Sequence, residues 1–202
     1  MTCSVVFNAD DFGFCGLRNA GILQSATRGV VRSATVLLSG TAVSEALRAG
    51  LLVLLFEIPC LTFFVNFCPF FFFPIYDMKG RAADLSLGLH LNLTEGRPVS
   101  APATIPTLCE PWTGCFRGKT CFLRAVLAGE VDTRDVYTEL CAQLQFFTAL
   151  KNDTLPTHLD GHNHVHVFPG VARVVAQLAA EFSISRLRLP IPPSPDPNLS
   201  VF

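Results

Sequence analysis

Three short apolar runs in this sequence end in side chains that can bind a metal ion or move a proton. The carboxyl ends of parallel strands meet at one edge of a sheet, and a β/α barrel builds its active site there. A chain with this pattern is expected to fold as a parallel α/β protein with one polar site. The first run, residues 3–7, leads to Asp10 and Asp11, the run 85–89 ends at His90, and the third leads to Asp160 and His162.

The segment 157–166 holds four of the five histidines in the chain, together with Asp160. Side chains alternate between the two faces of an extended strand, so Asp160, His162, His164 and His166 would share one side. Neutral imidazole is the commonest ligand for divalent transition metals in proteins. The segment therefore predicts a metal site, and the alternative is a solvated loop that happens to be rich in histidine.

The adjacent carboxylates of Asp10 and Asp11 strengthen the metal hypothesis. Two neighbouring acids at the end of a buried strand repel each other unless a cation or a proton separates them. One carboxylate and two imidazoles leave coordination positions open for water and substrate, which is typical of a catalytic metal site. The eight cysteines include no C-x-x-C pair, so the sequence does not predict a zinc finger.

The remaining pattern alternates between strand and helix, which favours a parallel α/β architecture. With 202 residues, the chain is short for a β/α barrel of about 250 residues. We expect a TIM-barrel-like α/β fold that is incomplete, with about five strands. The expected helices are 19–27, 41–48, 135–150 and 170–182, and strands are also expected at 33–38 and 186–189.

Residues 51–75 are almost entirely apolar and approach the length of a membrane span. Glu57 and several prolines interrupt them, and no belt of basic residues sets an orientation, so we do not expect a membrane helix. We interpret 51–83 as an insertion from non-coding sequence or a misplaced exon boundary, because a pyrimidine-rich tract encodes Phe-Phe-Phe-Phe-Pro. The proline-rich tail 190–202 is expected to be irregular.

Composition limits the partners and the compartment. The net charge is −1 and no cluster of Lys or Arg is present, so the sequence predicts no binding to nucleic acid or to an anionic membrane. Free cysteines without a secretory signal indicate a reducing, cytoplasmic compartment. The loop 98–118 is expected to lie over the site, where Trp112 and Phe116 would stack on a bound ligand or simply pack.

Three strings of the sequence together resemble the YdjC-like carbohydrate deacetylase family. The resemblance covers residues 3–49 and 85–189, so residues 1–189 are expected to form one partial domain that the insertion interrupts. It implies metal-dependent hydrolysis of the acetamide in N-acetylglucosamine-containing oligosaccharides, with Mg²⁺ as the expected cofactor and Zn²⁺ or another divalent ion left open. The strings are N-A-D-D-F-G at 8–13, G-L-H-L-N-L-T-E-G-R-P-V at 88–99 and P-T-H-L-D-G-H-N-H-V-H-V-F-P at 156–169.

The resemblance also implies a role for each candidate residue. Asp11, His90 and His162 would hold the cation, and Asp10 would accept a proton from water as the general base. His164 or His166 would protonate the leaving amine, or the donor would lie in a part of the family fold that this chain lacks. His166 is also the best candidate for a purely structural role. Asp160 would act as the acid or would orient His162.

Two other functions stay open at this point. One is an amidohydrolase-type enzyme that acts on another amide, and the other is a metal-binding isoform without catalytic activity. A closed barrel in this family would use seven or eight strands rather than about five, so we expect a weak enzyme at best. The expected partner is a small oligosaccharide, and the sequence leaves open whether the chain forms a homo-oligomer.

Overall fold

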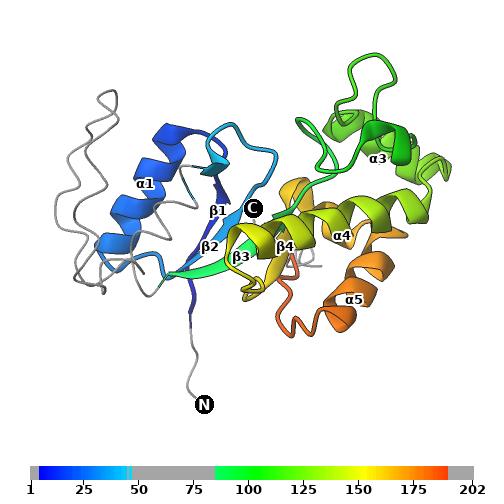
Figure 1. The fold of residues 1–202 in the computed structure, drawn as a ribbon. Coiled ribbons are helices and arrows are strands. Elements are labelled where there is room, and N and C mark those ends of the chain that lie inside the picture. Colours follow the sequence, from blue (N-terminus) through cyan, green and yellow to red (C-terminus); the bar gives the residue numbers. More distant parts are fainter. Residues whose placement is uncertain (1–4, 45, 47–84, 191–202) are drawn as a thin grey trace, which may run out of the picture.

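A computed structural model describes residues 5–44, 46 and 85–190 (Figure 1). Four strands form one parallel sheet in the order β1-β2-β3-β4. The α/β class and the parallel sheet predicted from the sequence are confirmed. The strands are β1 (Asn8–Phe12), β2 (Ser33–Val36), β3 (Ser86–Leu91) and β4 (Leu159–Gly161).

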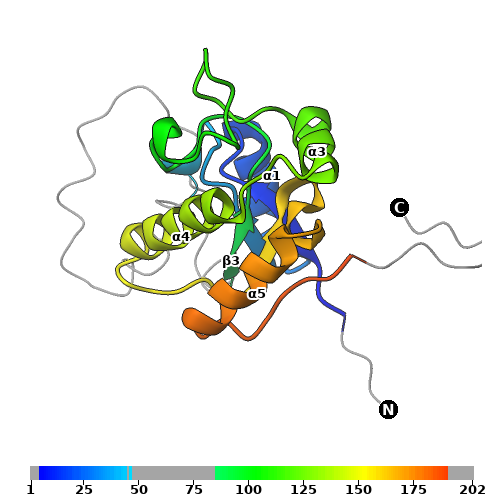
Figure 2. The ribbon, with the colours of Figure 1, turned by 90° about the vertical axis from the view of Figure 1, so that its right-hand side faces the viewer.

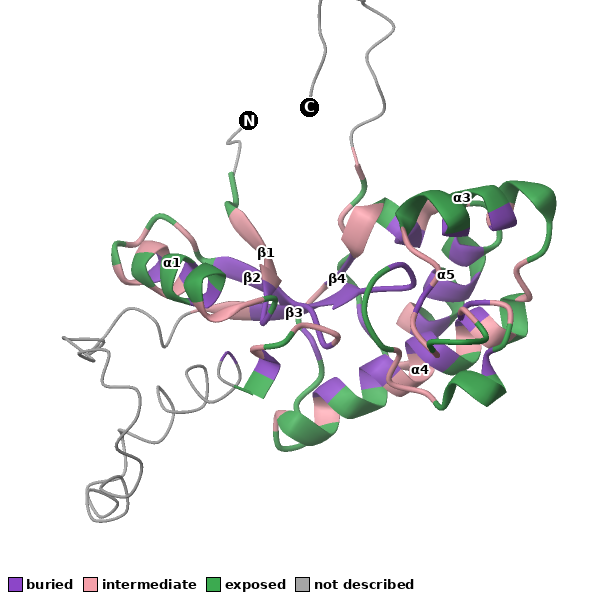
Figure 3. Cartoon of the chain, turned by 90° about the horizontal axis from the view of Figure 1, so that it is seen from above, coloured by how far each residue is buried: buried purple, intermediate pink, exposed green. Residues whose placement is uncertain are grey.

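Helices follow the strands, as the alternating pattern predicts. In Figure 3, α1 lies beside β1 and β2, whereas α3, α4 and α5 gather beyond β3 and β4. Figure 2 shows α4 and α5 in front of the strands, and these two helices pack against each other. The helices are α1 (Gly16–Thr27), α3 (Lys119–Ala128), α4 (Thr133–Leu150) and α5 (Val171–Glu181), with the 3-10 helices η2 (Pro102–Thr104) and η3 (His162–Val167).

The core joins the sheet to α4 and α5, and α1, α3 and the loop 98–118 also contribute buried side chains to it. The apolar face predicted for α4 is confirmed, because Val136, Leu140, Leu144 and Phe147 are all buried. The helix begins after Asp132, whose side chain accepts a hydrogen bond from the backbone N–H of Arg134. An aspartate at this position satisfies one of the free N–H groups of the first turn.

Two buried polar residues of α4 fix the loop that follows β3. Glu139 accepts hydrogen bonds from the backbone N–H groups of residues 99 and 100, both at 2.9 Å. Gln143 donates to the backbone oxygen of Asn92 at 2.6 Å and accepts from its N–H at 3.1 Å. Because buried polar groups are costly unless paired, these bonds hold the loop 92–100 in one place above the carboxyl end of β3.

The start of the first strand differs from the prediction. The sequence predicts a buried strand at 3–7, but among the described residues β1 begins at Asn8, and Val5 and Phe7 are 73% and 61% exposed. Residues 3 and 4 lie outside the described part. The register between β1 and β2 is regular at Ala9 and then shifts before Phe12. Such an irregularity bends a strand and redirects its side chains, and here it falls on the acidic pair.

Two other expected elements are only partly confirmed, and two expected segments lie outside the described residues. At 186–189 a single bridge, between Leu187 and Leu159, replaces the expected strand. The helix expected at 41–48 has helical backbone at 43, 44 and 46, whereas 41 and 42 form a turn, and 45, 47 and 48 lie outside the described residues. The insertion 51–83 also lies outside them, and so does the tail from 191 onward. Among the helices of the described part, none is long and apolar enough to cross a membrane.

The loop 98–118 contains η2 and an antiparallel bridge between Cys109 and Phe116. Phe116 is buried in the core, so it packs rather than facing a sugar. Trp112 is 94% exposed, and its contact with a sugar stays a prediction. The helix α3 that follows the loop was not predicted from the sequence.

Candidate metal centre

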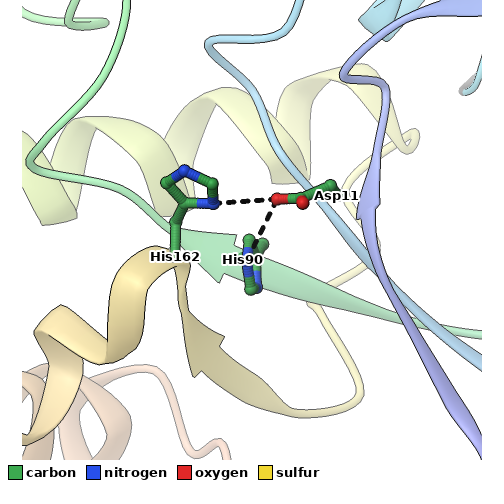
Figure 4. Close-up of side chains that lie close together, drawn as sticks. All are labelled: Asp11, His90 and His162. Atoms are coloured by element: carbon green, nitrogen blue, oxygen red, sulfur yellow. Dashed lines mark hydrogen bonds and ion pairs between the residues drawn. The ribbon is translucent and has the colours of Figure 1, made fainter. Parts of the chain in front are cut away.

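Three of the predicted site residues meet at the carboxyl ends of three strands. Asp11 lies near the end of β1, His90 near the end of β3, and His162 directly after β4. Their ligand atoms all lie within 4.8 Å of one another. In Figure 4 the carboxylate of Asp11 points at both rings: its Oδ1 lies 2.8 Å from Nδ1 of His162 and 3.3 Å from Nε2 of His90.

A local break in β1 brings Asp11 into this position. Its φ is +61°, a left-handed conformation that aspartate tolerates better than most residues. The next turn is fixed by Asn19 of α1, whose side-chain oxygen accepts from the N–H of Gly13 at 2.7 Å and whose amide donates to the backbone oxygen of Ala42 at 3.0 Å. The guanidinium of Arg18, also on α1, donates to Asp11 from the open side.

The histidine-rich segment does not continue as a strand, which corrects the prediction that its alternate residues share one face. β4 ends at Gly161, and η3 follows. Asn163 and His164 adopt left-handed backbone conformations with φ of +53° and +59°. The chain therefore turns sharply after His162, and the other histidines leave the site.

Each of these histidines has a different environment. His166 is buried and its Nε2 donates to the backbone oxygen of Arg188 at 2.8 Å, and burial lowers the pKa of its ring. His158 is hydrogen-bonded to Asn8 at 3.1 Å and packs on Gly88, and burial lowers its pKa as well. His164 is exposed. None of the three belongs to a group of three or more potential ligands in the described part of the chain.

Asp160 orients His90, not His162 as the sequence suggested. Its Oδ1 lies 2.6 Å from Nδ1 of His90, and its Oδ2 accepts from Thr35 Oγ1 at 3.1 Å and forms an ion pair with Arg188 Nη2 at 2.9 Å. When Nδ1 of His90 carries the proton, its Nε2 presents a lone pair toward Asp11. A carboxylate behind a histidine is the usual arrangement around a protein-bound metal.

Asp10 is paired with an arginine that sequence reasoning missed. Both of its oxygens accept from the guanidinium of Arg188, each at 2.8 Å, and Oδ1 also accepts from Asn8 at 2.8 Å. Burial alone would raise the pKa of Asp10, but the hydrogen bonds and charge of Arg188 hold it below its usual range. Arg188 thus bridges Asp10 and Asp160. The sequence did offer one signal for Arg188: it lies in the expected strand 186–189, and the carboxyl end of that strand would lie at the same edge of the sheet as Asp10.

The charges around His90 also shift its pKa. Burial on its own lowers the pKa of this ring, but its hydrogen bonds to Asp11 and Asp160 raise it to about 9. Burial alone would raise the pKa of Asp11, yet the hydrogen bonds from His162 and His90 hold it well below the usual range. Without a cation, a proton on His90 therefore partly balances the carboxylates.

Within the described residues, two groups of side chains could hold a divalent cation, and they share His90. The second group is Asp10, His90 and Asp160. Its carboxylates already bind the guanidinium of Arg188, and a cation there would compete with that fixed charge. Asp11, His90 and His162 instead offer one carboxylate and two imidazole nitrogens, a set that suits a divalent metal and leaves positions open. The first group is therefore the better candidate metal centre.

Comparison with known proteins places the chain among carbohydrate-active relatives. The sequence profile of the family described as YdjC-like protein matches residues 4–200. Carbohydrate deacetylases from human and mouse are each 36% identical, over 93% and 92% of this chain. A chitooligosaccharide deacetylase from Yersinia pestis is 29% identical over 89% of the chain.

The fold of the chain is also similar to that of a solved structure. The crystal structure of a protein from Enterococcus faecalis, proposed to be a cellobiose-phosphate cleavage protein, aligns with a TM-score of 0.69 and 26% identity over 91% of this chain and 57% of its own. The match covers 48% of the human relative, 50% of the mouse relative and 57% of the Yersinia relative. This chain therefore spans about half the length of the curated relatives it matches, and it belongs to the YdjC-like protein family.

Proposed function

We propose that the chain carries the metal-dependent site of a carbohydrate deacetylase. The substrate would be an N-acetylated carbohydrate such as an N-acetylglucosamine-containing oligosaccharide, and the products would be acetate and a free amine. The observation that carries the proposal is the convergence of Asp11, His90 and His162 within 4.8 Å at three strand ends. The names of the relatives from human and Yersinia pestis support the reaction class.

In this proposal Asp11, His90 and His162 are the ligands. A bound divalent cation would supply Lewis-acid polarisation of the amide oxygen and a lower pKa for water. The resemblance implies Mg²⁺, whereas two imidazoles suit Zn²⁺ better, because Mg²⁺ prefers oxygen ligands. Asp160 holds Nδ1 of His90 and so keeps Nε2 facing the site.

Asp10 is the proposed general base. Its contacts with Arg188 fix the direction of its carboxylate. The same contacts lower its pKa, so the carboxylate stays ionised at neutral pH and is a weaker base than a free one. Proton acceptance at Asp10 then depends on how closely a water approaches it.

His164 is the better proposed proton donor of the two histidines suggested from the sequence. It is exposed and lies two residues after His162. His166 is buried, and its Nε2 already donates to a backbone oxygen. A donor must reach the leaving nitrogen of the substrate, and only an exposed ring can do so.

A second candidate function is a metal-binding protein without turnover. The pairing of both Asp10 oxygens with Arg188 favours it, since a carboxylate held by arginine is a poor proton acceptor. Acetate release from N-acetylchitobiose, measured with and without a chelator, separates the candidates. Chelator-sensitive release supports the deacetylase. Binding of metal without release supports the second candidate, and absence of both contradicts the proposed site.

A further inference from the structure

The second histidine of the metal centre also has a carboxylate behind it. Nδ1 of His162 faces Asp11, and its other ring nitrogen, Nε2, lies 3.4 Å from Oε2 of Glu95. His90 shows the same arrangement, with Asp160 2.6 Å from the ring nitrogen that points away from Asp11. Both imidazoles thus lie between Asp11 and a second carboxylate.

Glu95 is held in place on both sides, although its side chain is 49% exposed. Its backbone N–H donates to Asn92 Oδ1 at 3.2 Å, and its backbone oxygen accepts from Asn92 Nδ2 at 2.7 Å. Its Oε1 accepts from Asn163 Nδ2 at 3.2 Å. Since Gln143 of α4 fixes the backbone of Asn92, the carboxylate of Glu95 is tied to the core.

The turn that directly follows His162 is held by hydrogen bonds to the loop after β3. Asn163 and His164 both have a positive φ, a backbone conformation that is strained for a residue with a side chain. Asn163 is held by its bonds to Thr94 Oγ1 at 3.1 Å and to Glu95. The loop after β3 thus fixes both the turn and the ring at its start.

We infer that Glu95 is a positioning residue for His162. When Nδ1 of His162 binds the cation, its Nε2–H points to the carboxylate of Glu95, which lies 3.4 Å away and keeps the lone pair of Nδ1 directed at the cation site. The inference rests on the proposed metal site and goes beyond it, because it assigns a role to a residue outside the ligand set. Loss of a carboxylate behind a metal-bound histidine typically weakens metal affinity about 10–100-fold.

Two substitutions separate positioning from a general effect of negative charge. Glu95→Gln removes the charge and turns an amide N–H₂ toward either His162 or Asn163. Glu95→Asp keeps the charge but is shorter by one methylene, so its carboxylate no longer reaches Nε2. Glu130→Gln is the matched control, because Glu130 is exposed and its nearest cation, on Arg117, is 4.0 Å away.

The experiment is calorimetric titration of Zn²⁺ into the full chain and these three variants, with circular dichroism to show that each is folded. We expect about 10-fold weaker binding for both Glu95 variants and unchanged binding for Glu130→Gln. With Zn²⁺ bound, the ¹⁵N resonances of His162 should show a hydrogen-bonded Nε2–H in the wild type and a solvated one in Glu95→Asp.

Wild-type affinity in Glu95→Asp would overturn the inference while leaving the metal site in place. Absence of Zn²⁺ binding by the wild-type chain would instead overturn the proposed site together with the inference. The two failures are therefore distinguishable within one titration series.

Discussion

The carboxylate of Asp160 supports both His90 and Arg188, and replacing it with asparagine tests that role. Asp160 is fully buried, accepts from His90 and Thr35 at 2.6 and 3.1 Å, and forms an ion pair with Arg188 at 2.9 Å. Asparagine keeps the volume, but its N–H₂ cannot accept from the two donors at Oδ2. Removing one partner of a buried ion pair costs about 3–5 kcal/mol. Arg188 would still be paired with Asp10 in this variant. We therefore expect the lower end of this range, a loss of about 3 kcal/mol in the free energy of unfolding.

The same substitution should change how the stability of the metal-free protein depends on pH. The pKa of His90 is raised from 6.5 to about 9, so the folded protein binds more protons than the unfolded chain between these values. The resulting stabilisation is fully present below pH 6.5 and is lost as the pH rises through about 9. The difference corresponds to on the order of 3 kcal/mol. Without Asp160 this pKa is raised by Asp11 and by the charge of Asp10, so the loss should be smaller by at least ~1 kcal/mol.

Urea unfolding with chelator present, at about pH 6 and about pH 9.5, measures both effects. The exposed Asp153 offers a matched control, and Asp153→Asn should behave as the wild type at both pH values. Comparing variants cancels the contributions of the other histidines. An equal loss of stability with rising pH in the wild type and in Asp160→Asn would refute the reasoning.

Three further results are expected. Asp10→Asn should keep Zn²⁺ affinity and lose about 10²–10⁴-fold in acetate release; loss of metal in this variant with retention in Asp11→Asn would reverse the two roles. Metal binding near neutral pH should release a proton, because the pKa of His90 is raised to about 9; titration heats that do not depend on the ionisation enthalpy of the buffer would contradict this. Gly88→Ala should destabilise the fold by about 1–3 kcal/mol in urea, because a Cβ there would lie 2.6 Å from the ring of His158; unchanged stability would show that the ring moves aside.

Much of the site could be predicted from the sequence because strand ends are visible in it. The apolar runs before Asp11 and His90 end in ligand-type residues, and parallel strands bring such ends together. The start of β1 could not be predicted, since residues 5–7 are apolar but exposed. The apolar composition of residues 5–7 shows only that their burial would be favourable. It does not show whether the neighbouring strand β2 extends far enough to cover them, and the pairing with β2 begins at Asn8.

The turn after β4 shows a second limit of sequence reasoning. Alternation along an extended strand predicts that His162, His164 and His166 share a face, and the structure contradicts this at Gly161. The ring of His166 occupies the space where a Cβ of Gly161 would lie, so the glycine permits the chain to fold back on itself. The role of Arg188 could not be predicted either, because its partner Asp10 lies 178 residues away in the sequence.

The most direct test of the central claim is a crystal of the chain grown with Zn²⁺, with diffraction measured at the zinc absorption edge. Our account predicts one anomalous peak about 2.0–2.2 Å from an oxygen of Asp11, Nε2 of His90 and Nδ1 of His162. A peak between Asp10 and Asp160, or no peak near His90 at full Zn²⁺ saturation, would contradict it.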